Sequence, residues 1–377
     1  MTITARELNR ATLARQLLLR REPLSVGDAT KRVLALQAQQ PASPYLALWN
    51  RVDGFDPADL DAAFTDRTLV KATLLRITLH AVHSDDYRML REAMRPTLHA
   101  SRLGYRFAAA GLTPADAAQL EPGLLEFAAH PRSNGDMTSW LAERVGEEKK
   151  DGAWWGLRSY TPLTHVPTGG PWSFEYSPAY VASPEGSFAA EPDESALRAL
   201  ALRYLEAYGP ASIADVAQFA TVQRARVKKA LRELGAAVEE LEGPDGTTLY
   251  DIPGAPRPPA DTPAPPRLLP MWDSVLLAYA DRSRVIPPDY RRLVTRNNGD
   301  VLPTLLVDGY VAGVWRPVEG GIEATAFHDL SDEAWKGLAK EARALGTLLA
   351  NREPTVYSRY GHWWSKLPEV EARRLHF

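Results

Sequence analysis

The sequence predicts an α+β protein made of three tandem winged-helix units and a small C-terminal antiparallel β-barrel. Three observations predict this class. Helical patterns followed by a strand or hairpin pattern recur three times within residues 1–252, which is the element order of a winged helix. Nine prolines then fall between Pro244 and Pro270, a density that no helix or central strand tolerates. Beyond them, turn signals separate short apolar runs, as in a small barrel or meander.

The first predicted unit, residues 1–100, opens with helices. Apolar residues at helical spacing predict one helix over residues 6–20 and a second over residues 28–36. Asp56 followed by Pro57 combines a cap residue with a proline at the first helical position, which begins a third short helix.

A strand is predicted next, over residues 74–82. Its apolar side chains alternate with Arg76, Thr78 and His80, which therefore share one polar face. The strand completes the first helical-then-β unit.

The second predicted unit spans residues 101–190. Its helices begin at the Thr113-Pro114 cap, and a hairpin is predicted over residues 157–176 with its turn at Gly169 and Gly170. We assign this hairpin as the wing of the second predicted winged helix.

The third predicted unit spans residues 191–252. Helices flank a turn at Gly209-Pro210, and the last of them, residues 220–234, is strongly basic. A Gly-Pro-Asp-Gly turn at residues 243–246 predicts the closing hairpin.

A proline-rich connector, residues 253–270, separates these units from the predicted barrel, residues 271–377. Asp308-Gly309 lies between two apolar runs, which is a strong hairpin signal. The remaining elements predicted in this region are a turn at residues 319–321, strands over residues 268–279 and 291–295, and a closing helix over residues 331–350.

Composition narrows the functional classes. The 377-residue chain has no cysteine, which excludes disulfides, thiolate zinc sites and a cysteine nucleophile. No apolar run approaches the roughly 18 residues of a membrane helix, and no signal-peptide core follows the first residues, so we expect a cytoplasmic protein without a membrane partner. Phosphate-binding loops, nucleophile elbows and zinc-protease motifs are absent. His80 and His83 fall on opposite faces of the predicted strand, so neither a metal nor another cofactor is expected.

Positive charge is local in a chain whose net charge is −3. Each basic cluster fits a solvated helix face, but three clusters in an acidic chain favour a polyanionic partner. The clusters are residues 6–32, residues 224–232 with Lys228 and Lys229, and residues 282–296 with Arg282 and Arg284.

Gln37 and Gln39 stand where the second predicted helix gives way to Gln40-Pro41. Proline disfavours the helical region at the residue before it, so the chain leaves the helix here and two amides can converge on one point. The alternative is that both amides cap the last helical carbonyls and bind solvent.

Several segments together resemble the AlkZ-like winged-helix DNA glycosylases. They are Leu-Ala-Leu-Gln37-Ala-Gln39-Gln-Pro, Leu75-Arg76-Ile-Thr78-Leu-His80-Ala-Val, His165-Val-Pro-Thr-Gly-Gly-Pro-Trp172, Leu268-Leu-Pro-Met-Trp272-Asp273, Ala280-Asp-Arg282-Ser-Arg284 and Val307-Asp-Gly-Tyr-Val-Ala-Gly-Val-Trp315. No single segment is decisive, but their order is specific and covers nearly the whole chain.

The resemblance implies a C-shaped molecule around duplex DNA, with Gln37 and Gln39 as catalytic residues. The implied activity is hydrolysis of the N-glycosidic bond of bulky N7-alkylpurines, including interstrand crosslinks formed by a natural product such as azinomycin B. It also implies a bacterial, nucleoid-associated enzyme. Arg76, Thr78 and His80 become candidates to enter or flank a DNA groove, whereas Lys228, Lys229, Arg282 and Arg284 become candidates for phosphate contacts.

Two further expectations concern the type of protein. No lysine adjoins the glutamines in the sequence, so we expect a monofunctional enzyme without lyase activity, acting as a monomer. The alternative is a winged-helix transcriptional regulator with a C-terminal sensor domain, because most winged helices bind DNA without altering it. A third alternative is a resistance protein that sequesters the alkylating agent itself.

Overall fold

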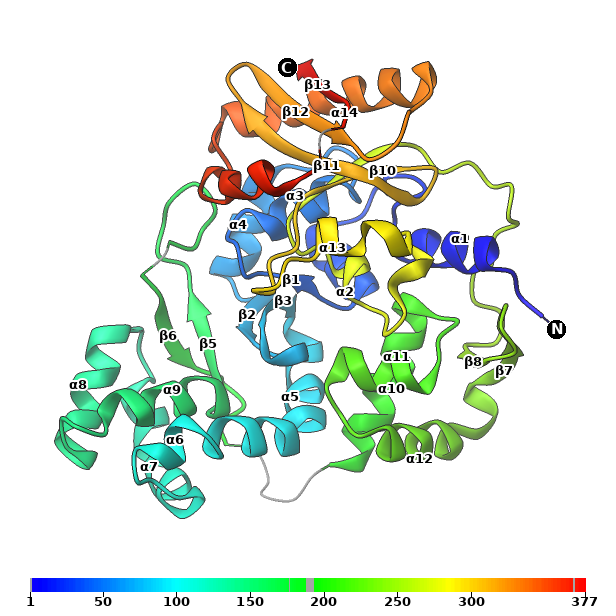
Figure 1. The fold of residues 1–377 in the computed structure, drawn as a ribbon. Coiled ribbons are helices and arrows are strands. Elements are labelled where there is room, and N and C mark those ends of the chain that lie inside the picture. Colours follow the sequence, from blue (N-terminus) through cyan, green and yellow to red (C-terminus); the bar gives the residue numbers. More distant parts are fainter. Residues whose placement is uncertain (1, 176, 188–192, 369) are drawn as a thin grey trace.

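The computed structural model describes residues 2–175, 177–187, 193–368 and 370–377. Within them the chain forms helices and three sheets, which confirms the α+β class. In Figure 1 the C-terminal sheet lies at the top, above the N-terminal helices, and two groups of helices from the middle of the chain lie below it on opposite sides.

The N-terminal segment contains four helices and three strands. Helix α1 begins at the capping box of Thr4 with Glu7, and α2 begins at Ser25, whose side chain accepts from the Asp28 amide. Asp56 caps α4 as predicted. The elements are α1 (Ala5–Arg15), α2 (Val26–Val33), β1 (Leu36–Gln37), α3 (Ser43–Trp49), α4 (Pro57–Thr65), β2 (Leu69–Thr73) and β3 (Leu79–His83).

The strand predicted over residues 74–82 is wrong. The segment is a hairpin in which β2 pairs with β3 around a short 3-10 turn, Leu75–Ile77. Arg76 and Ile77 both have positive φ, +54° and +57°, so the chain reverses there although no glycine marks the turn. Alternation of polar and apolar residues continued through the reversal, which hid the turn from the pattern.

The largest sheet has six strands in the order β1-β3-β2-β5-β6-β4, and it crosses from the first predicted unit into the second. The crossing is the pairing of β2 with β5 at Lys71 and His165. The intervening and following elements are α5 (Ser84–Leu98), a π-helical turn (His99–Leu103), α6 (Arg106–Ala109), α7 (Pro114–Phe127), β4 (Arg132–Ser133), α8 (Asn134–Val145), α9 (Lys150–Tyr160), β5 (Leu163–Val166) and β6 (Ala179–Ala182).

The second hairpin lies later in the chain than predicted. Residues 157–160 still belong to α9, and the paired residues are Leu163 with Ala182 at one end and Val166 with Ala179 at the other. The predicted turn at Gly169 and Gly170 therefore lies inside a longer connection, part of which, residue 176, is outside the described residues.

Three helices and a two-stranded hairpin follow, in the order predicted for the third unit. The elements are α10 (Glu194–Tyr208), α11 (Ile213–Ala220), α12 (Arg224–Leu234), β7 (Glu239–Glu242) and β8 (Thr248–Asp251). This order is the one on which the winged-helix prediction rests, and the assignment of the three units as winged helices stays a prediction. The predicted boundary between residues 190 and 191 lies outside the described residues.

The C-terminal part forms a five-stranded antiparallel sheet in the order β13-β12-β11-β10-β9. The predicted hairpin around Asp308-Gly309 is present, but the described strands form an open sheet, so the closed barrel is not confirmed. The elements are β9 (Arg267–Leu269), α13 (Arg291–Val294), β10 (Thr304–Val307), β11 (Tyr310–Val318), β12 (Gly321–Ala326), α14 (Asp332–Ala350) and β13 (Ala372–His376).

Two strand predictions in this region are wrong. Residues 291–294 form helix α13, and most of residues 268–279 consists of turns after the short strand β9. The closing helix is confirmed, because α14 begins after Ser331, whose side chain accepts from the Ala334 amide. Edge strand β13 carries two arginines and a histidine among its five residues and gave no strand signal.

The largest core joins the two ends of the chain. Side chains such as Leu13 and Leu46 from the N-terminal helices pack in one cluster with Trp315 and Leu345 from the C-terminal sheet and helix. Two other cores lie under α10–α12 and under α6–α9. A continuous apolar core thus packs the N-terminal segment, which carries both glutamines, against the C-terminal part of the chain.

Candidate active site

Gln37 lies in a strand rather than at a helix end. Helix α2 ends at Val33 because Leu34, at φ +72°, turns the chain, and Leu36 and Gln37 then pair with Ala81 and His80 of β3. The predicted departure from the helix occurs, but it comes four residues before the glutamine and does not depend on Pro41.

Hydrogen bonds fix both ends of the Gln37 amide. Its Nε2 donates to Thr78 Oγ1 over 3.0 Å, and its Oε1 accepts from an Nη2 hydrogen of Arg76. The side chain is only 4% exposed. Because a carbonyl oxygen has two lone pairs, Oε1 can still accept one hydrogen bond.

Gln39 is anchored beside Gln37 but is exposed to solvent. Its Oε1 accepts from the Leu79 amide over 2.9 Å, and the backbone N–H of Ala38 donates to the Leu79 carbonyl. The side chains of the two glutamines therefore form hydrogen bonds with two consecutive residues, Thr78 and Leu79, where β3 begins. Both side chains are thus anchored at one edge of the six-stranded sheet, where β1 pairs with β3.

Arg76 is half-buried, and its guanidinium has no carboxylate partner among the described residues. Its guanidinium lies 5.1 Å from the ring centroid of Phe219 in α11 and 3.1 Å from His80 Nε2. Its Nη1 is buried without a hydrogen-bond partner there. Burial lowers the pKa of Arg76 to about 10, so the group stays charged at neutral pH. A buried charge next to Gln37 fixes the amide so that its oxygen faces the arginine.

His80 is held as a neutral ring. It is fully buried, and its Nδ1 lies 3.0 Å from the Thr78 carbonyl, so Nδ1 carries the proton and Nε2 can accept from Arg76. Burial and, after it, the charge of Arg76 lower the pKa of His80 well below its usual value. Arg76, Thr78 and His80 surround Gln37 instead of forming an exposed strand face.

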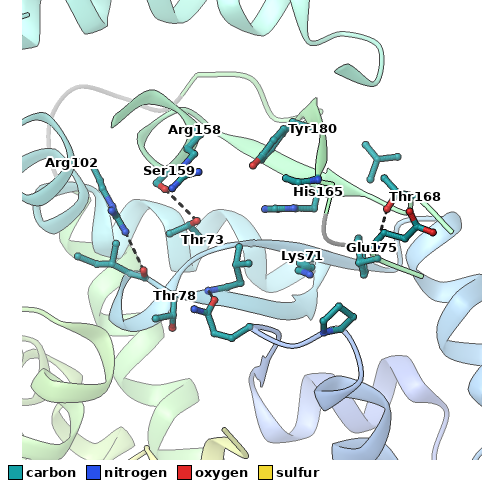
Figure 2. A pocket seen from close by; sticks show the side chains of 17 residues that line it. Lys71, Thr73, Thr78, Arg102, Arg158, Ser159, His165, Thr168, Glu175 and Tyr180 are labelled. Carbon is teal, nitrogen blue, oxygen red and sulfur yellow. Dashed lines mark hydrogen bonds between the residues drawn. The ribbon is translucent and has the colours of Figure 1, made fainter. Parts of the chain in front are cut away.

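A cavity of about 340 Å³ opens beside Gln39. Figure 2 shows Lys71, His165 and Tyr180 along one of its walls, with Arg102 and Arg158 at one end and Thr168 and Glu175 at the other. Thr78 and Leu79, which anchor the glutamines, also line it. One of the two predicted catalytic amides thus faces an open cavity large enough for a nucleoside-sized group.

Lys71 is the residue of this site that the sequence analysis missed. It sits in the middle of β2, only 5% exposed, with its Nζ 4.4 Å from the ring centroid of Phe174. Burial lowers the pKa of Lys71 to about 7. A lone lysine within the apolar run Leu69–Leu75 was the available signal, but strand β2 itself was not predicted there.

The other predicted DNA contacts lie apart from the glutamines in the chain. Lys228 and Lys229 are exposed on α12, and Lys229 Nζ is 3.8 Å from Glu233. Arg282 and Arg284 are half-buried in a short 3-10 turn, where Arg284 donates to the Pro210 carbonyl over 2.7 Å. After burial, the charge of Arg282 contributes to lowering the pKa of Arg76, which places these two guanidinium groups near each other.

Neither a metal site nor a membrane-spanning helix is found among the described residues. No group of three or more His, Asp or Glu side chains there gathers as metal ligands would. No helix in the same residues is long and apolar enough to cross a membrane.

Comparison with known proteins shows the class of enzyme to which the chain belongs. The chain belongs to the AlkZ-like DNA glycosylase family, whose family model matches residues 30–348, and it is accordingly a DNA glycosylase. The resemblance noted in the sequence is thereby confirmed.

Individual relatives agree. The chain is similar to the "Interstrand DNA cross-link repair glycosylase" of Streptomyces sahachiroi, with 26% identity over 345 residues that cover 88% of this chain and 92% of the relative. The solved structure of Streptomyces sahachiroi DNA glycosylase AlkZ matches with a TM-score of 0.80 and 22% identity, over 93% of this chain and 98% of that chain. This structural likeness supports the fold.

Proposed function

We propose that this protein is a monofunctional DNA glycosylase that hydrolyses the N-glycosidic bond of bulky N7-alkylpurines and unhooks interstrand crosslinks. The observation that carries the proposal is the pair of amides anchored on Thr78 and Leu79, with Gln39 facing a cavity. The name of the Streptomyces sahachiroi relative supports crosslink repair. The sequence resemblance to AlkZ-like enzymes implies an azinomycin-type crosslink, which is therefore the proposed lesion.

Two amides suit this substrate class for a chemical reason. An N7-alkylated purine is cationic and leaves without being protonated, so the enzyme mainly positions water and stabilises an oxocarbenium-like sugar. A neutral amide is no general base at pH 7, but its carbonyl oxygen orients a water molecule. In the proposed mechanism the free lone pairs of Gln37 Oε1 and Gln39 Oε1 hold that water beneath C1′.

Arg76 acts in this proposal as a positioning residue. Its bond to Gln37 Oε1 fixes which end of the amide faces the turn, and its bond to His80 keeps the guanidinium in place. The cation also lies beside a site that binds a polyanion, so a DNA phosphate near the turn supplies the missing counter-charge.

DNA binding is proposed to use both sides of the molecule. Lys228 and Lys229 on α12 contact phosphates on one side, and Arg282 and Arg284 contact them closer to the glutamines. An open cavity beside Gln39 suits a crosslinked guanine, because a base tethered to the opposite strand cannot swing freely into a closed pocket. The proposed active species is a monomer.

The test is an assay of products from duplexes that carry 7-methylguanine or an azinomycin crosslink. Release of free modified base with formation of an alkali-labile site is the expected result. Sequence-specific binding of unmodified duplex without base release would support the transcriptional regulator instead. Tight binding of the alkylating agent in the absence of DNA, again without base release, would support the sequestering protein.

A further inference from the structure

We propose that Arg102, Arg106 and Arg158 form a phosphate-binding surface for the DNA strand whose lesion lies at the cavity beside Gln39. The inference deepens the proposed function and rests on it, because that function brings a lesion-bearing strand to this cavity. The three arginines lie outside the basic clusters that the sequence analysis singled out. They come from two segments of the chain, the π-helical turn with the start of α6, and the end of α9.

Two glycines of α9 bring these segments together. Gly152 and Gly156 are four residues apart, so they lie on the same side of the helix. A Cβ atom at Gly156 would lie 3.0 Å from the carbonyl oxygen of Arg102, and one at Gly152 would lie 3.1 Å from that of Arg106. Both distances are shorter than ordinary van der Waals contacts, so the glycines let α9 pack directly against the π-helical turn and α6.

Trp155 of α9 orients two of the guanidinium groups. The Cζ atom of Arg102 lies 4.9 Å from the centroid of the indole ring, and the Cζ atom of Arg106 lies 5.4 Å from it. The ring is half-buried, which fixes its position. Because an aromatic face holds an arginine without neutralising it, both cations are held in place and can still bind an anion.

None of the three arginines forms an ion pair with a carboxylate in the part of the chain that the structure describes. Asp151 lines the same hollow of about 330 Å³ as Arg106 and Arg158, but it forms no ion pair with either of them there. In the neighbouring helices α5 and α8, by contrast, Arg88 and Arg144 are paired with glutamates. Unpaired like charges repel one another, and a bound phosphate relieves this repulsion.

The surface continues into the cavity beside Gln39. Arg102 and Arg158 line one end of that cavity, as Figure 2 shows, and Arg158 also lines the hollow described above. Arg102 Nη2 donates to the carbonyl oxygen of Ile77 over 3.2 Å, in the turn directly before Thr78. The arginine thus contacts the segment that anchors the glutamines, and a strand bound along this surface passes the cavity.

An exposed aromatic ring belongs to the same surface. Tyr105, between Arg102 and Arg106 in the chain, is 72% exposed, more than any other large apolar side chain of the described residues. Aromatic rings next to cations are typical of nucleic-acid-binding surfaces, where they stack on bases while the cations contact the backbone. The ring and the unpaired arginines together therefore fit a DNA strand.

The first experiment is arginine footprinting on the wild-type, full-length protein. Phenylglyoxal, which modifies accessible guanidinium groups, is applied with and without an unmodified duplex, and the modified residues are mapped by mass spectrometry. We expect the duplex to protect Arg106 and Arg158, which are exposed in the free protein, and to leave exposed Arg343 of α14 reactive. Equal labelling of Arg106 and Arg158 with and without DNA, or equal protection of Arg343, would overturn the inference.

The second experiment measures duplex affinity at several salt concentrations. Arg158→Met keeps an unbranched side chain but removes the charge, so it should weaken binding and reduce the slope of log affinity against log salt by about 1. Arg158→Lys keeps the charge and should keep the slope. Arg343→Met removes the same charge elsewhere and should bind as the wild type does. An unchanged slope for Arg158→Met, or an equal reduction for Arg343→Met, would contradict the proposal.

Both experiments use DNA without a lesion, so neither depends on base excision. The footprint is made on the wild-type protein and stays decisive if a variant fails to fold. A missing footprint therefore counts against the phosphate-binding surface alone, whereas missing base release from an alkylated duplex counts against the proposed glycosylase chemistry alone.

Discussion

Gln37 and Gln39 have different surroundings although only one residue separates them. Gln37 is buried, with both ends of its amide bonded, whereas Gln39 is exposed and has one end bonded to the backbone. We infer that Gln37 fixes the geometry of the water site and that Gln39 completes it from the cavity side.

Replacing either glutamine with alanine is expected to slow base release on the order of 100-fold, because each carbonyl fixes one hydrogen of the attacking water. The measurement is single-turnover release of 7-alkylguanine, with DNA affinity measured in parallel. Gln119→Ala, on the exposed surface of α7, is the control. Rates equal to wild type for both variants would remove the glutamines from the mechanism.

Lys71 also predicts how stability depends on pH. Burial lowers its pKa from 10.5 to about 7, so between these values the unfolded chain binds more protons than the folded one. The free energy of unfolding of the wild type should therefore rise with pH across this window relative to Lys71→Met. Urea unfolding of both proteins at pH 7, 8 and 9 measures the difference. Parallel curves would mean that the lysine is solvated and keeps an ordinary pKa.

At the scale of single elements, helix α12 carries the exposed lysines proposed to contact phosphates. Each of Lys228→Ala and Lys229→Ala should weaken binding of every duplex sequence alike and reduce the slope of log affinity against log salt by about 1. Titrations at several salt concentrations with two unrelated duplexes measure this. Loss of affinity for only one sequence would instead indicate base contacts by this helix.

Elements with strong local signals were predictable from the sequence. Capped helices such as α4 and α14, and the hairpin at Asp308-Gly309, have the cap or turn residues that their geometry requires. The turn at Arg76 was not predictable, because no glycine marks its positive φ and the contacts of Arg76 are with Gln37 and Phe219, which are distant in the sequence. Local patterns of residue types in the sequence do not reveal such long-range contacts.

The candidate site was predictable only in part for the same reason. Family resemblance pointed to Gln37 and Gln39, whose side chains bond to the consecutive residues Thr78 and Leu79. The place of Lys71 in the cavity beside Gln39, however, depends on which strands are neighbours in the sheet, and the pairing of β2 with β5 joins residues 94 positions apart, Lys71 and His165. A one-dimensional pattern does not specify that register.

At the scale of the whole molecule, a buried ion pair ties the N-terminal segment to the C-terminal part. Arg51 and Asp273 form two hydrogen bonds of 2.8 Å each, with exposed side-chain fractions of 1% and 0%. Arg51→Met leaves the carboxylate of Asp273 buried and unpaired, which should lower the free energy of unfolding by about 3–5 kcal/mol.

Urea denaturation measures this loss, and the exposed pair of Arg20 with Glu22 provides the control. Arg20→Ala should change the free energy of unfolding only slightly, since exposed ion pairs contribute little. Similar losses for the two variants would show that the Arg51 pair does not hold the two parts together.

Crosslink unhooking tests the central claim most directly. A duplex joined by an N7–N7 guanine crosslink is incubated with the enzyme in excess, and the strands are resolved on a denaturing gel. We expect the crosslinked species to be converted to separate strands. One strand should carry an abasic site, and the other should carry the released adduct still attached to its guanine. A crosslinked duplex that is bound by the protein yet stays intact would contradict it.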